Sequence, residues 1–163
     1  MKILSMKTTI FLGAMLSLLV CLMFTGCSNS ETNSTSRGLT DFAHIEEEYL
    51  ATIDSLNWPD GITLPDKLED EDTGASFQVG YGETRASYLW EYSWMKEWLD
   101  TYNTDPERAE KALEELEKAF DMPYMGIDRC DDATRNYLRE NIDKAKLDDP
   151  SGFTESIRAN YAN

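Results

Sequence analysis

The stretch from Glu83 to Tyr102 reads ETRASYLWEYSWMKEWLDTY and holds three of the four tryptophans in the chain. On a wheel of 100° per residue, one face carries Tyr88, Tyr92, Met95, Leu99 and Tyr102, and an adjoining stripe carries Trp90, Trp94 and Trp98. The two together cover about 200° of the helix, which is wider than the apolar face of an ordinary surface helix. The pattern favours a central helix contacted on two sides. The alternative is an exposed binding stripe, because tryptophan is enriched at binding hot spots.

Helical spacing of apolar residues continues on both sides of this stretch. Helices are predicted over 39–56, over 83–102, from a capping box at 104–107 through Phe120, over 131–147, and over a short segment that starts at Pro150. Residues 57–82 form an irregular connection in which two short apolar pieces can pair as a hairpin. The sequence therefore predicts an all-α bundle of four to five helices, with a long irregular loop between the first and second helices.

The charge of the chain narrows the classes of partner. Its 163 residues include 15 Lys and Arg against 31 Asp and Glu, for a net charge of -16. Nucleic acid is excluded as a partner, because a protein binds phosphates mainly through Lys and Arg. The single His excludes zinc sites built on several imidazoles.

The first 27 residues have the composition of an export signal. Lys2 and Lys7 precede a fifteen-residue run from Ile10 to Phe24 in which only Gly13 and Ser17 are not apolar. The run is shorter than the ~20 apolar residues of a membrane-spanning helix. The alternative interpretation is an uncleaved N-terminal anchor, which would export the domain as well.

The end of this run, Phe24-Thr25-Gly26-Cys27, resembles the lipobox of bacterial lipoproteins, in which an apolar and two small residues precede a cysteine. The resemblance implies cleavage after Gly26 and attachment of a diacylglycerol to the sulfur of Cys27. It implies a lipid-anchored protein on the extracytoplasmic face of the cell membrane, and a second acyl chain would make the anchoring stable.

Cleavage would change the length and the net charge of the remaining chain. Removal of residues 1–26 takes away Lys2 and Lys7 but no acidic residue, so the 137-residue mature chain carries a net charge of -18. Residues 27–37 are predicted to form the lipidated cysteine and a flexible tether, and residues 38–163 a single helical domain. Cys130 is the one remaining unmodified thiol, and we expect it to be buried and inert.

A buried ion pair is predicted between Glu46 and Arg85. Glu46 falls inside the apolar stripe of the first helix, where a carboxylate needs a partner or a raised pKa. Arg85, at the edge of the packed face of the second helix, is the expected partner.

The connection contains an acidic run whose carboxylates are weak candidates for a metal site: Asp66, Glu69, Asp70 and Asp72. The run lacks the glycine and glutamate spacing of a calcium loop, so a solvated acidic loop and no metal site are predicted. Trp58 and Tyr81 flank the connection and are candidate ligand contacts.

Two functions from different classes fit these features. The first is a non-enzymatic lipoprotein that acts as a protein-interaction or accessory module at the cell surface. The second is a ligand-binding lipoprotein for a cation or a cationic small molecule, because an acidic cleft concentrates cations. Neither hypothesis requires a cofactor, and the sequence offers no catalytic constellation.

Overall fold

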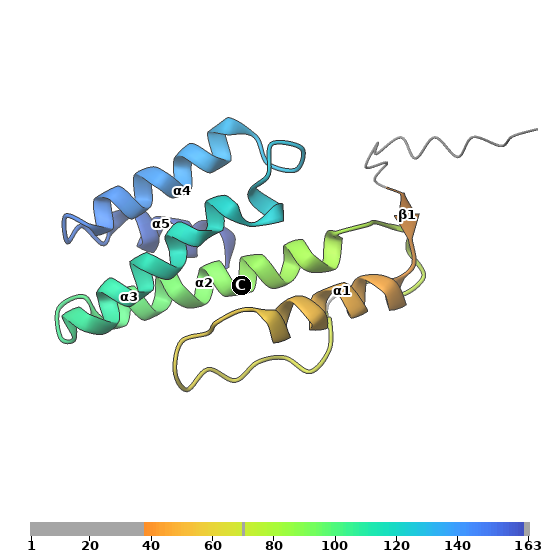
Figure 1. Ribbon diagram of the computed structural model, residues 1–163, viewed down its shortest axis with the longest axis horizontal. Coiled ribbons are helices and arrows are strands. Elements are labelled where there is room, and N and C mark those ends of the chain that lie inside the picture. The colour runs from red at the N-terminus through yellow and green to blue at the C-terminus, as the bar shows by residue number, and fades with distance from the viewer. Residues whose placement is uncertain (1–37, 70, 162–163) are drawn as a thin grey trace, which may run out of the picture. The chain divides into compact units, whose positions relative to one another are not determined.

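A computed structural model describes residues 38–69 and 71–161. The predicted signal peptide, Cys27 and the tether lie outside these residues. The elements are β1 (Leu39–Thr40), α1 (Phe42–Ser55), β2 (Phe77–Gln78), α2 (Tyr81–Thr101), α3 (Pro106–Glu117), the 3₁₀ helices η1 (Lys118–Asp121) and η2 (Pro123–Met125), α4 (Asp132–Ala145) and α5 (Ser151–Asn160). Figure 1 labels β1 and the five α-helices. The five α-helices confirm the all-α prediction. Within the described ranges, none of them is both long and apolar enough to span a bilayer.

Aspartate side chains fix the start of three helices. Asp41 before α1, Asp105 before α3 and Asp131 before α4 each accept the backbone N–H of the residue three positions later, at 3.0, 3.2 and 2.8 Å. Such caps satisfy one of the backbone N–H groups that a helix leaves without a partner at its first turn. The predicted capping box is displaced by one residue, because Asp105 rather than Thr104 is the cap.

Helix α2 is the central helix of the fold. It packs against α1 on one side and against α3, α5 and η2 elsewhere on its surface (Figure 1). Trp90, Trp94 and Trp98 are each 1% exposed, so the alternative of an exposed binding stripe does not hold. The indole N–H groups of Trp90 and Trp94 both donate to the carbonyl oxygen of Asn57, at 2.8 and 3.2 Å, which satisfies their polar atoms inside the core.

The core consists of two hydrophobic clusters that share α2. One cluster contains the three tryptophans of α2 and apolar residues of α3, α4 and α5. The other contains Ile45, Tyr49 and Ile53 of α1 with Leu68 of the connection and Ala86 of α2. Trp58 is half-buried and packs against both clusters. Burial of these side chains supplies the main favourable free energy of folding.

A glycine allows α1 and α2 to approach closely. A Cβ atom at Gly82 would lie 1.8 Å from the carbonyl oxygen of Ile45, a separation that no side chain can adopt. At this distance between α1 and α2, position 82 must therefore be a glycine.

The connection between α1 and α2 supplies one strand. Strands β1 and β2 pair antiparallel, with Leu39 opposite Gln78 and Thr40 opposite Phe77. This pairing differs from the predicted hairpin within the connection. Because α1 and α2 lie side by side, the residues that precede each helix are brought together and pair with each other.

Candidate ligand-binding site

Glu91 of α2 is a buried acid beside a pocket. Glu91 is 8% exposed, and its Oε2 accepts the hydroxyl hydrogen of Tyr124 at 2.8 Å. Its Oε1 accepts no hydrogen bond from the described residues. Oε1 is also not fully buried, because the fully buried side-chain atoms without a partner in the described residues consist of Nδ2 of Asn141 alone. Oε1 therefore keeps some accessible surface, and Glu91 lines the pocket described below.

The environment of Glu91 makes ionisation costly. Burial raises the pKa of Glu91 from 4.5 to about 7, against the smaller lowering effect of the hydrogen bond from Tyr124. No basic side chain among the described residues forms an ion pair with it. A cation in the adjoining pocket would supply the missing partner.

The pocket has a volume of about 320 Å³ and lies among α2, η2, α4 and α5. Its aromatic lining consists of Tyr88, Tyr137 and Tyr161, and the other lining residues are Met125, Thr134, Leu138, Ser156 and Asn160. Tyr88 and Tyr137 are 41% and 40% exposed, so parts of both side chains remain in solvent. The pocket thus combines an accessible aromatic lining with one buried carboxylate.

The tyrosines are held by contacts with one another. The rings of Tyr88 and Tyr124 meet edge to face at 5.7 Å, and those of Tyr92 and Tyr161 are 4.8 Å apart. The hydroxyl of Tyr161 donates to the carbonyl oxygen of Tyr88 at 3.2 Å. Burial raises the pKa of Tyr88, Tyr124 and Tyr161, so their hydroxyls stay neutral at physiological pH.

No protein-family model matches the chain, and no curated protein or solved structure matches it.

The predicted ion pair between Glu46 and Arg85 is replaced by two other interactions. Nη1 of Arg85 lies 2.9 Å from Oε1 of Glu71, which also accepts the hydroxyl hydrogen of Tyr81 at 2.7 Å. Oε1 of Glu46 accepts the backbone N–H of Leu68 at 3.3 Å. The folded connection thus gives Arg85 a carboxylate that the helical wheel cannot reveal, and a backbone group satisfies Glu46.

The carboxylates of the acidic run are engaged separately. Glu69 pairs with Lys67 at 2.9 Å, and Oδ1 of Asp72 accepts the backbone N–H of Gly74 at 2.9 Å. Asp66 is exposed, and Asp70 lies outside the described residues. Across residues 38–69 and 71–161, no three His, Cys, Asp or Glu residues are grouped so that they could hold a metal ion.

The two other candidate contacts do not line the Glu91 pocket. Trp58 donates its indole N–H to the carbonyl oxygen of Ile53 at 2.9 Å, which ties the end of α1 to the connection. Tyr81 is half-buried and lines a neighbouring pocket together with Arg85 and Leu89.

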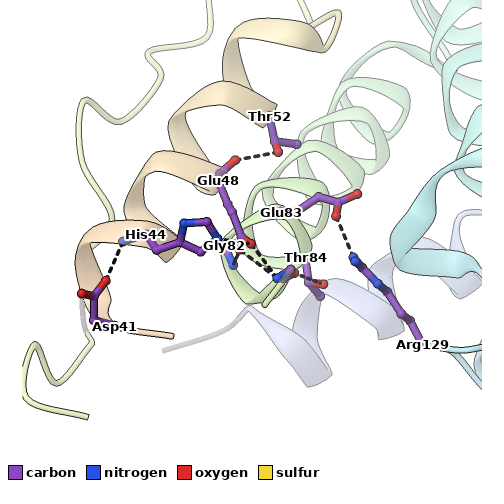
Figure 2. A network of polar contacts seen from close by, with 9 residues as sticks. Asp41, His44, Glu48, Thr52, Gly82, Glu83, Thr84 and Arg129 are labelled. Carbon is purple, nitrogen blue, oxygen red and sulfur yellow. Dashed lines mark hydrogen bonds and ion pairs between the residues drawn. The ribbon is translucent and has the colours of Figure 1, made fainter. Parts of the chain in front are cut away.

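A carboxylate of α1 neutralises the positive end of the α2 helix dipole. Figure 2 shows Glu48 of α1 directed at the first residues of α2. Its two oxygens accept the N–H of Gly80 at 2.7 and 2.9 Å, and Oε2 also accepts that of Gly82 at 3.2 Å. A carboxylate at this place is favourable because the helix dipole is positive there. Nε2 of His44 lies 3.3 Å from Oε1 of Glu48, and Arg129 pairs with Glu83 at 2.6 Å nearby. This network is structural, since Glu48 already occupies the position that an external anion would take.

Proposed function

We propose that this protein is a membrane-anchored extracytoplasmic lipoprotein that binds a cationic small molecule in the pocket beside Glu91, without catalysing a reaction. The lipobox-like segment that ends at Cys27 supports the anchoring. The unpaired carboxylate of Glu91 in an aromatic pocket supports the binding activity.

The same geometry favours ligand binding over a protein-interaction module. The aromatic stripe of α2 was one of the features behind the interaction hypothesis, and its three tryptophans are inside the core. The Glu91 pocket is concave, mostly apolar and carries one convergent ionisable group, which is the usual composition of a small-molecule site.

A cation would be bound by two complementary forces. The ionised carboxylate of Glu91 offers an opposite charge in a poorly solvated environment, where the attraction is stronger than in water. The rings of Tyr88, Tyr137 and Tyr161 offer cation–π attraction of about 0.5–2 kcal/mol each where the geometry allows. The net charge of -18 on the mature chain would also raise the local concentration of cations.

Isothermal titration with tetramethylammonium tests this proposal. The full chain is purified in a non-ionic detergent and titrated near pH 8, where Glu91 is mostly ionised. We expect saturable binding that Glu91→Gln weakens by roughly 10- to 100-fold, the equivalent of one charge-assisted contact. Glu47→Gln, which changes an exposed glutamate of α1, is the matched control and should bind normally. Absence of saturable binding, or equal affinity in the Glu91 variant, would refute the proposed ligand site.

Anchoring is tested separately in cells. Cys27→Ala should abolish incorporation of labelled palmitate, whereas Cys130→Ala, which changes the other cysteine of the mature chain, should leave it intact. Equal labelling of both variants would contradict the lipoprotein proposal.

A further inference from the structure

We infer that the ligand is an amphipathic organic cation, whose charged head contacts Glu91 and whose apolar tail occupies a second, adjoining pocket. This inference depends on the proposed binding function and adds the chemical class of the ligand.

The second pocket lies between α2, the connection and the end of α5, with a volume of about 600 Å³. Its apolar lining includes Tyr49 of α1, Leu68 of the connection and Leu89 of α2. Sites for small organic ligands commonly enclose about 300–1,000 Å³, so either pocket alone is large enough for such a group. A compact ammonium group beside Glu91 would leave the second pocket unused.

The two pockets meet along a common rim. Tyr88, Asn160 and Tyr161 line both of them. The hydrogen bond from the Tyr161 hydroxyl to the Tyr88 carbonyl oxygen holds two parts of this rim together at 3.2 Å. A single ligand can therefore contact Glu91 and continue over the rim into the second pocket.

The charges of the second pocket favour an uncharged tail. Its two basic side chains already have partners, since Arg85 is 2.9 Å from Glu71 and Lys67 is 2.9 Å from Glu69. The charges of the second pocket are therefore neutralised within the protein, whereas Glu91 has no basic partner among the described residues. A second ionic group on the ligand would have to displace one of these pairs, whereas an alkyl chain would bury apolar surface without disturbing them.

A series of alkyltrimethylammonium ions tests the inference. Tetramethylammonium and its ethyl, butyl and hexyl homologues are titrated into the detergent-solubilised full chain, its Glu91→Gln variant and its Leu89→Asn variant. We expect affinity to rise by up to about fourfold for each added methylene in the wild type, since burial of one methylene contributes ≈ 0.8 kcal/mol. In Leu89→Asn the rise should be clearly smaller, while the affinity for tetramethylammonium should be unchanged. Partition of the ions into detergent is the same for all variants and cancels in the comparison.

The outcomes separate this inference from the function on which it depends. Binding of tetramethylammonium with no dependence on tail length would overturn the inference and leave the proposed function standing. Equal tail-length dependence in the wild type and in Leu89→Asn would also overturn it. If Leu89→Asn does not fold, Pro65→Asp, at an exposed position of the same pocket, replaces it. Absence of binding by the whole series would overturn both proposals.

Discussion

Replacement of Glu91 by glutamine should stabilise the protein at mildly alkaline pH and change little at acidic pH. The folded carboxyl has a pKa of about 7 against an ordinary value of 4.5, so it holds its proton more tightly when the chain is folded. This contribution to stability is fully present below pH 4.5 and is lost as the pH rises through 7. The pKa difference corresponds to roughly 3 kcal/mol, at 1.36 kcal/mol per pKa unit.

The amide of the introduced glutamine side chain would avoid this loss. Its carbonyl oxygen can still accept the Tyr124 hydroxyl hydrogen, while the group never has to ionise. We therefore expect the free energy of unfolding of Glu91→Gln to exceed that of the wild type by roughly 3 kcal/mol at pH 8 and by less than about 1 kcal/mol at pH 5. For a domain of this size, the difference at pH 8 corresponds to a rise in Tm of about 10 °C.

Urea unfolding from pH 5 to pH 8, followed by tryptophan fluorescence, measures this difference. The many other carboxylates also titrate on unfolding, so the informative quantity is the variant minus the wild type at each pH. Glu47→Gln, on the exposed side of α1, is the matched variant that also replaces one glutamate by glutamine. A difference for Glu91→Gln that stays constant with pH would refute the reasoning, because the burial of Glu91 would then not perturb its ionisation.

Three further substitutions test the fold. Trp98→Ala, in the core, should lower the free energy of unfolding by about 3–5 kcal/mol in urea titrations. Gly82→Ala should destabilise the domain by more than about 2 kcal/mol, because its methyl group would overlap a carbonyl oxygen of α1, whereas Gly74→Ala has ordinary clearance and should be tolerated in the same assay. Glu48→Ala should lower Tm by several degrees through loss of the contacts at the start of α2, with Glu47→Ala as the unaffected control.

The helices are the part of the structure that the sequence predicts best. Periodic apolar residues and aspartate caps are local signals, and the predicted segments agree with α1 to α5 to within a few residues. Burial of the α2 tryptophans is harder to predict from the sequence. A stripe of aromatic residues looks the same whether a neighbouring helix or solvent covers it, and only the packing of α3 and α5 decides the matter.

The sequence prediction missed the candidate site, although a signal for it existed. The wheel that places Glu46 among apolar residues also places Glu91 between Trp98 and Tyr102, where the two aromatic faces of α2 meet. The partner of each acid could not be predicted, because partners come from distant segments. Tyr124 lies 33 residues from Glu91, and the N–H that satisfies Glu46 belongs to Leu68, 22 residues away in the irregular connection.

The pairing of β1 with β2 has a mechanical consequence. The described part of the chain begins at Gly38, whose carbonyl oxygen accepts the N–H of Val79 at 3.0 Å, and the two residue pairs of the β1–β2 ladder follow immediately. Because β1 leads into α1 and β2 leads into α2, tension applied to the chain before Gly38 is shared between α1 and the central helix α2. If the chain is anchored through Cys27 as proposed, a force applied from the membrane would act through this strand pairing on α2 and its buried tryptophans as well as on α1. The force on the contacts between α1 and the rest of the domain would then be smaller.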